Sequence, residues 1–260
     1  MTASAPAPSR RAARTARKAR PRRRASVTSV LGELLLTAGV LVLLFVAWQM
    51  WIGDRIIGAE ADREGAALSA EWAALPPPSA PEPVVEGEKV FYEPVIGERP
   101  VGTEVFATMR IPRFGDDYAV EVAGGTTRKH TLDHARLGLY DQAAMPGEVG
   151  NFAVAGHRTT WGARLRHIDA LQLNDPIIVE MPEGWYLYRF RTLEYVRPTQ
   201  VDVLLDVPRM PGVETGERYI TLTACSPLHS LAERIIAYGV FDSFQPRAAG
   251  EPAWLRGEDT

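Results

Sequence analysis

An uncharged apolar run of nineteen residues, LLLTAGVLVLLFVAWQMWI at 34–52, constrains this chain more than any other feature. At ~1.5 Å per residue, a helix of this length crosses the hydrocarbon core of a bilayer. Trp48 and Trp51 stand at its far end, where indole rings favour the membrane interface. We therefore expect one transmembrane helix over residues 29–52. A cleaved signal peptide is the alternative, but its apolar region would be shorter and a small-x-small site would replace WQMWIGDR.

The charges before this run predict its orientation. Residues 1–24 hold nine Lys or Arg and no acid, which leaves 20 basic against 32 acidic residues in the remainder. Because positive flanks stay in the cytoplasm, residues 1–28 are expected to be a basic cytoplasmic tail of a single-pass cell-membrane protein. The rest of the chain is then outside the cytoplasm. The basic arm could instead bind nucleic acid, but topology already explains its charge, so we expect no nucleic-acid partner.

Composition divides the remainder into four parts. Residues 53–83 begin with an Ala- and Glu-rich stretch, which predicts a helical stalk, and end in PPPSAPEP, a stiff extended linker. Residues 84–103 are polar with Gly and Pro, and are expected to be a further linker or a segment that covers a groove. Residues 104–244 are expected to be the main folded domain, and residues 245–260 a disordered tail.

Short runs rich in Val, Ile, Tyr, Phe and Thr fill residues 104–244, separated by Gly, Pro and Asp. This pattern predicts an all-β barrel or sandwich. Short helical pieces are expected near residues 131–136 and 164–172. The expected strands are 105–111, 119–122, 151–155, 176–180, 185–196, 218–224 and 232–241.

Cys225 is the only cysteine, so it has no partner for a disulfide within the chain. Its thiol is therefore inert, intermolecular or reactive. Alternate side chains of a strand point to opposite faces, so the run RYITLTAC places Cys225 on the face of Thr223 and opposite Leu222 and Ala224. Cys225 also ends the strand, where a side chain projects into a groove more readily than into a core.

Two further residues provide what a cysteine nucleophile needs. His157 follows a strand end, whereas the other four histidines lie in contexts that favour solvated or capping roles. Arg234 begins the next strand, so a hairpin returns its guanidinium toward Cys225; a surface salt bridge with Glu233 or Asp133 is the alternative. A thiolate needs a cation nearby, the leaving amine needs an acid, and the tetrahedral oxyanion needs a donor. Arg and His side chains supply these functions.

Five motifs follow one another in this part of the chain: IPRFGDDY, MPGEVGNFAVAGHRTTWG, LQLNDPIIVE, TLTACSP and ERIIAYGVF. Their order and spacing over residues 104–241 resemble the sortases, most closely the class E housekeeping sortases of actinobacteria. The resemblance implies an all-β fold, a sortase-type eight-stranded β-barrel with short helices, preceded by one N-terminal transmembrane helix. It implies a cysteine transpeptidase without a cofactor. Such an enzyme cuts a sorting signal of the LAxTG or LPxTG type between Thr and Gly and passes the protein to a cell-wall amine.

The resemblance also implies roles for individual residues. Cys225 matches the nucleophile, His157 the general acid and base, and Arg234 the residue that holds substrate and oxyanion. Tyr140 matches an aromatic substrate contact, and Thr223 and Ala224 adjoin the nucleophile as further substrate contacts. The family pattern is TLxTC, so Ala224 stands where Thr is usual and a side-chain contact is lost. The implied partners are secreted proteins with sorting signals, the amine of a peptidoglycan precursor, and the membrane.

Two other readings stay open. A papain-like peptidase would place Cys before His at a helix start, and an L,D-transpeptidase would carry an SxGC run; the sequence has neither pattern. A membrane-tethered scaffold or inactive sortase-like protein with an inert Cys225 is the non-enzymatic reading. Residues 84–103 contain no DPW or DPF lid motif, which argues against a pilin-polymerising sortase. No metal site is predicted, because one Cys and scattered His lack ligand spacing.

Overall fold

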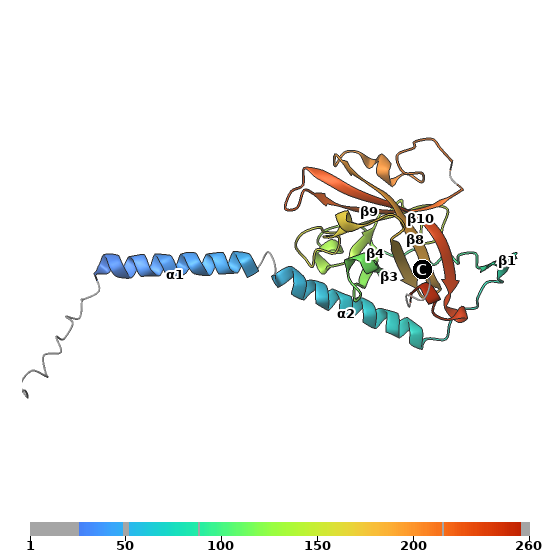
Figure 1. Cartoon of the computed structure of the whole chain (residues 1–260), viewed down its shortest axis with the longest axis horizontal. Helices are drawn as coiled ribbons and strands as arrows, with labels where there is room; N and C mark the ends of the chain where they lie inside the picture. The colour runs from blue at the N-terminus through green and yellow to red at the C-terminus, as the bar shows by residue number, and fades with distance from the viewer. Residues whose placement is uncertain (1–25, 49–51, 88, 215, 256–260) are drawn as a thin grey trace, which may run out of the picture. The chain divides into compact units, whose positions relative to one another are not determined.

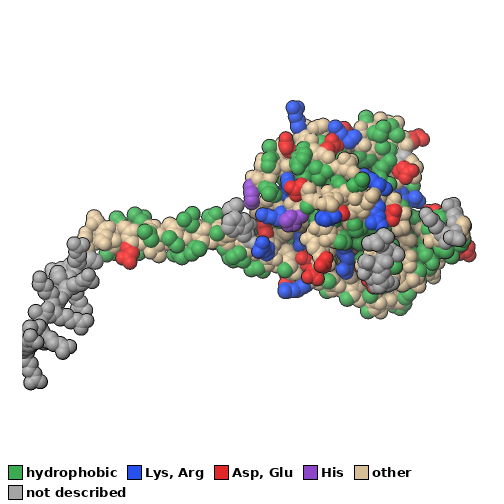
Figure 2. All heavy atoms as spheres, viewed as in Figure 1, with side chains coloured by type: hydrophobic (Ala, Val, Ile, Leu, Met, Phe, Trp, Pro, Cys, Tyr) green, Lys and Arg blue, Asp and Glu red, His purple; other side chains and the backbone are tan. Residues whose placement is uncertain are grey.

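The structure, a computed structural model, describes residues 26–48, 52–87, 89–214 and 216–255. The basic tail up to residue 25 and Trp51 of the expected interface lie outside these ranges. Helix α1, Val27–Ala47, forms a unit of its own and is long and apolar enough to cross a membrane. Figure 2 shows hydrophobic side chains along α1, and none of its residues is buried. Among the described residues it is the one helix with this character.

Eight strands close into a barrel in the order β10-β8-β7-β3-β4-β5-β6-β9. Figure 1 shows β8, β9 and β10 as long strands of this barrel. The predicted eight-stranded all-β barrel is thereby confirmed. Two neighbouring pairs are parallel, β4 with β5 and β6 with β9, and the other barrel pairs are antiparallel. The strands are β3 Val105–Arg110, β4 Val120–Gly124, β5 Leu137–Leu139, β6 Gly150–Ala155, β7 Pro176–Met181, β8 Gly184–Val196, β9 Arg218–Ser226 and β10 Glu233–Pro246.

Single 3-10 turns occupy several connections between the strands. Both predicted helical pieces are reduced to such turns, at η3 Leu132–His134 and η4 Ile168–Ala170. The remaining turns are η2 Pro112–Phe114, η5 Val201–Leu204, η6 Arg247–Ala249 and η7 Ala253–Leu255. Large apolar side chains fill one main core, with Phe152, Tyr186 and Tyr188 among its fully buried members.

Helix α2, Gly53–Ala74, lies along the outside of the barrel (Figure 1). Every third or fourth residue on one side is buried, in the series Gly58, Ala61, Gly65, Ser69 and Trp72. The small residues let the two backbones approach closely, since a Cβ atom at Gly65 would lie 2.9 Å from the carbonyl carbon of Ala119. The helix expected here therefore forms, but it packs against β3, β4 and β7 and is not a free stalk.

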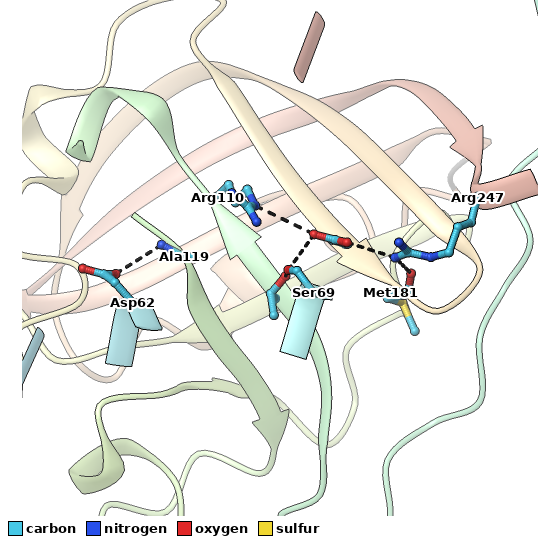
Figure 3. Close-up of polar contacts among 8 residues, drawn as sticks. Asp62, Ser69, Arg110, Ala119, Met181 and Arg247 are labelled. Carbon is cyan, nitrogen blue, oxygen red and sulfur yellow. Dashed lines mark hydrogen bonds and ion pairs between the residues drawn. The ribbon is translucent and has the colours of Figure 1, made fainter. Parts of the chain in front are cut away.

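Polar contacts also join α2 to the barrel, and Figure 3 shows two of the places where they do so. The backbone N–H of Ala119 donates to Asp62 Oδ1 over 3.1 Å. Further along the helix, Ser69 Oγ donates to Glu180 Oε2 over 2.8 Å. Glu180 is itself buried and pairs with Arg247 over 3.0 Å, so this end of α2 also meets the C-terminal segment.

Residues 84–103 form part of the barrel domain over much of their length. They begin with a two-stranded hairpin, β1 Val84–Glu86 and β2 Lys89–Phe91. Tyr92 and Val95 pack against the main core, and Tyr186 Oη donates to the Val95 carbonyl over 2.5 Å. Beyond the hairpin, this segment is packed against the barrel. It is therefore not the free linker that was one of the two expectations.

The expectation of a disordered tail from residue 245 is wrong over residues 245–255. β10 extends through residue 246, and the chain then turns back over the outer side of β7 and β8. Arg247 stacks over the Trp185 ring with 4.6 Å to its centroid, and Trp254 and Leu255 pack against the same cluster. These two apolar side chains have a partner surface on the barrel, which the polar residues around them in the sequence did not indicate.

Candidate active site

The three expected catalytic residues lie in one row across three neighbouring strands. β9 and β10 are antiparallel, with Cys225 directly opposite Arg234. β6 and β9 are parallel, with Ala155 opposite Thr223, and the Gly156 N–H continues this ladder by donating to the Thr223 carbonyl over 3.0 Å. His157, two residues past Ala155, therefore reaches the level of Cys225. The sequence order of these residues did not require this alignment, because β6 and β9 are far apart in the chain.

The two faces of β9 separate polar from core residues, as the alternation predicted. Ala224 is 3% exposed and belongs to the main core, together with Ile235 directly opposite it on β10. Cys225, on the other face, is a free and partly exposed cysteine. The side chain of Ala224 therefore points away from Cys225 and Thr223. On the face of Cys225, Ala224 presents only its backbone, because its methyl group lies in the core.

His157 makes a contact that the sequence analysis missed. Its Nε2 lies 2.7 Å from Asp133 Oδ1, and both side chains are largely buried. Asp133 is in the turn η3, 24 residues earlier, and Arg128 Nε lies 3.7 Å from the same carboxylate oxygen. Because an ionised carboxylate only accepts hydrogen bonds, Nε2 carries the proton in this contact and Nδ1 is left to face another group. Nothing in the local sequence around Asp133 signals this pairing.

Arg234 is held by backbone carbonyls at the start of β10. Its Nη1 donates to the carbonyl oxygens of Leu231 over 3.2 Å and Glu233 over 2.9 Å. No ion pair joins Arg234 to the carboxylate of Glu233 or Asp133, two residues that the structure describes. The surface salt bridge considered from the sequence is therefore absent, and the guanidinium keeps N–H groups for a further acceptor.

Tyr140 and Thr223 are brought together on the Cys225 side of the barrel. Their hydroxyl oxygens are 2.9 Å apart. Burial raises the pKa of Tyr140 above its ordinary value, while the hydrogen bond with Thr223 and the charge of Arg234 lower it in part. The Tyr140 hydroxyl is thus protonated at neutral pH and able to donate. The electrostatic influence of Cys225 also raises this pKa.

The wall next to Tyr140 includes residues from the segment before the barrel. Arg99 donates to the carbonyl oxygens of Asp141, over 3.3 Å, and Ala143, both just beyond Tyr140. A hollow beside Tyr140 is lined by Gly102 of this segment, by Gly124 at the end of β4 and by Leu139 at the end of β5. The segment at 84–103 therefore flanks the Tyr140 side of the site. Among the described residues, no group of three or more His, Cys, Asp or Glu side chains is placed to hold a metal ion.

Comparison with known proteins identifies the family of this chain. The sortase domain matches residues 109–242. Sortase SrtE1 of Streptomyces coelicolor is 33% identical over 249 residues, which are 93% of this chain and 64% of that protein. Sortase SrtE2 of the same organism is 30% identical over 223 residues, which are 83% and 82% of the two chains.

A solved structure extends the comparison to three dimensions. The crystal structure of sortase E1 from Streptomyces coelicolor, with a tripeptide in its active site, is 36% identical with a TM-score of 0.53. The match covers 57% of this chain and 94% of that one. The chain therefore belongs to the sortase family, whose members are cysteine transpeptidases. Its relatives are sortases of class E, and it spans 64% of the length of SrtE1, slightly less than two thirds.

Proposed function

We propose that this protein is a membrane-anchored cysteine transpeptidase that cleaves a sorting signal of the LAxTG or LPxTG type between Thr and Gly. It would then transfer the new carboxyl terminus to an amine of the cell wall. The observation that carries the proposal is the row formed by β6, β9 and β10, in which Cys225 lies opposite Arg234 and level with His157. Membership of the sortase family supports the same chemistry.

The reaction proceeds in two steps. The Cys225 thiolate attacks the carbonyl carbon of the substrate threonine, and the guanidinium of Arg234 stabilises the oxyanion. The C–N bond to glycine then breaks, and His157 gives its proton to the leaving amine. In the second step His157 takes a proton from the incoming amine, which attacks the thioester carbon and forms a new amide. Cys225 leaves as a thiolate, and water in place of the amine gives hydrolysis.

Two hydrogen bonds support the reacting groups. Asp133 contacts Nε2 of His157 and thereby holds the ring in one orientation. Nδ1 would then be the nitrogen that exchanges a proton with the reacting groups. The pair of Tyr140 and Thr223 lies on the Cys225 side of the barrel and is proposed to contact the sorting peptide. Ala224 would contribute through its backbone, since its methyl group is in the core.

The proposed location is the cell membrane, with a single span. Helix α1 is compatible with one transmembrane segment. The nine basic residues before it and the acidic excess after it support a cytoplasmic N-terminus and a catalytic domain on the outer side. The partners would then be secreted proteins with sorting signals and an amine of a peptidoglycan precursor, without nucleic acid.

The proposal is tested by ligation in solution. The chain from Gly53 onward, which retains α2, is incubated with LAxTG and LPxTG peptides and an oligoglycine amine, and the products are read by mass spectrometry. A product joining the peptide threonine to the amine, lost in Cys225→Ala, supports a transpeptidase and ranks the two signals. A folded protein that gives neither ligation nor cleavage contradicts the proposal and favours the scaffold with an inert thiol.

A further inference from the structure

The loop that follows His157 has an unusual backbone. Thr160, Trp161 and Ala163 have φ angles of 64°, 51° and 45°, and Gly162 between them has 76°. Side chains other than glycine pay a conformational cost in this left-handed region, and a run of such residues persists only when its surroundings impose it. The conformation of this loop therefore depends on what packs against it.

The first half of α2 supplies that packing. The backbone N–H of Thr160 donates to Asp54 Oδ2 over 3.0 Å. Arg164, at the end of the loop, donates through Nη1 to the Gly58 carbonyl over 3.0 Å and through Nη2 to Asp62 Oδ1. Gly58 is also close to the loop itself, since a Cβ atom there would lie 3.4 Å from the carbonyl oxygen of residue 162. Both ends of the strained run are thus tied to one helix.

Arg164 is the connection between α2 and the catalytic histidine. Its side chain is 4% exposed and lies 4.6 Å from the centre of the Tyr118 ring, so it has little freedom to move. The next residue, Leu165, donates its backbone N–H to the His157 carbonyl over 2.9 Å. A displacement of Arg164 is therefore transmitted to the backbone of His157 through one covalent bond and one hydrogen bond.

We propose that α2 is a positioning element of the active site, and that Asp62 acts through Arg164 on the loop that carries His157. The inference rests on the proposed transpeptidase function. It assigns α2 a role in the chemistry beyond connecting the barrel to the membrane helix. A displacement of a catalytic group by about 1 Å is enough to lower a rate by about 100-fold. The loss of the single contact between Asp62 and Arg164 is therefore expected to change the rate measurably.

A matched pair of variants in the full chain, held in detergent micelles, tests the proposal. Asp62→Ala removes the contact of α2 with Arg164 at the end of the His157 loop, together with the acceptor of the Ala119 N–H. Ser69→Ala removes a buried contact of the same helix with Glu180 on β7, away from the loop. Both variants are expected to lower the melting temperature. Only Asp62→Ala is expected to lower kcat for peptide cleavage, by about tenfold or more with KM little changed.

The pH dependence of Cys225 alkylation provides a readout that a purely structural role would not change. Displacement of His157 is expected to shift this profile in Asp62→Ala and leave it unchanged in Ser69→Ala. Asp62→Asn keeps an oxygen acceptor for Arg164 and is expected to restore most of kcat. Where Asp62→Ala does not fold, Asp54→Ala removes the contacts of α2 with Thr160 and Arg166 at the same loop and tests, by the same two readouts, whether α2 positions it.

The outcomes separate this inference from the proposed function. If Asp62→Ala matches Ser69→Ala in both kcat and alkylation profile, α2 has a structural role alone and the inference is overturned. If the wild-type chain neither cleaves nor ligates peptide, the proposed function fails. The alkylation profiles then still decide whether α2 positions the histidine loop.

Discussion

Helix α2 lies so close to the barrel at Gly65 that adding a single methyl group there, in Gly65→Ala, should change the stability of the protein measurably. In an isolated helix Gly65→Ala would stabilise by about 1 kcal/mol, because alanine has the higher helix propensity. Here the new Cβ atom would lie 2.9 Å from the carbonyl carbon of Ala119, and this obstacle is backbone that no rotamer change relieves. Overpacking of a rigid contact costs about 3 kcal/mol. The net effect is a destabilisation of about 2 kcal/mol.

For a domain of this size, that loss corresponds to a fall in melting temperature of about 4 to 8 °C. The measurement is thermal unfolding followed by near-ultraviolet circular dichroism. Ala67→Gly, on the exposed side of the same helix, is the matched control, since it loses helix propensity alone and should lower the melting temperature by about 2 to 4 °C. A melting temperature that rises in Gly65→Ala would refute the reasoning, because it would mean that α2 is not packed on the barrel at this residue.

Two further predictions concern the active site, and a third concerns stability in acid. Asp133→Asn should lower kcat by about tenfold or more, because the amide no longer fixes the protonated nitrogen of His157; unchanged kcat would contradict this role. Tyr140→Phe should lower kcat/KM for the sorting peptide by about 2- to 10-fold, because it removes the hydroxyl group that pairs with Thr223. If the loss is equal for every peptide, the Tyr140 hydroxyl does not discriminate among the side chains of the peptide. Arg113 holds the pKa of Asp175 below its ordinary value of 3.8, so the stabilisation present above that pH is lost as the pH falls through the lower, folded-state pKa. Asp175→Asn should therefore flatten the acid limb of unfolding below about pH 4, and an unchanged acid limb would exclude this pair as its source.

Much of the barrel could be predicted from the sequence, because its longer strands are rich in strand-favouring residues and are separated by Gly, Pro and Asp. The seven expected strands all form, within a few residues of their predicted limits. Strand β5, Leu137–Leu139, was missed because three residues carry too little periodicity. The short helices were predicted longer than the turns that form, since local propensity does not report how many residues the barrel connections leave free.

Long-range packing explains what the sequence could not provide. The Gly58, Ala61 and Gly65 series is compatible with a free Ala-rich helix and with a helix packed on the barrel. Only the contacts with the barrel distinguish these two possibilities. Trp254 and Leu255 likewise pack against a surface that residues of β7 and β8 form, and the local sequence around them does not show this surface.

The sequence predicted which residues form the candidate site better than it predicted the hydrogen bonds between them. Strand alternation placed Cys225 and Thr223 on one face, and the structure agrees. The same alternation puts Ala224 on the opposite face, in the core, so a substrate contact at this residue would be made by its backbone. The pairing of His157 with Asp133 depends on how a turn folds against the end of β6, and a single sequence carries no signal for that distance.

The central claim is that Cys225 forms an acyl-enzyme with the threonine of a sorting signal. It is tested most directly by intact-protein mass spectrometry after mixing the chain with an LAxTG-containing peptide in the absence of any amine. The account predicts a mass increase equal to the peptide up to its threonine, located on Cys225 by digestion, removed by added oligoglycine and absent in Cys225→Ala. A cleaved peptide without this adduct at any time point, or an adduct that persists in Cys225→Ala, would contradict it.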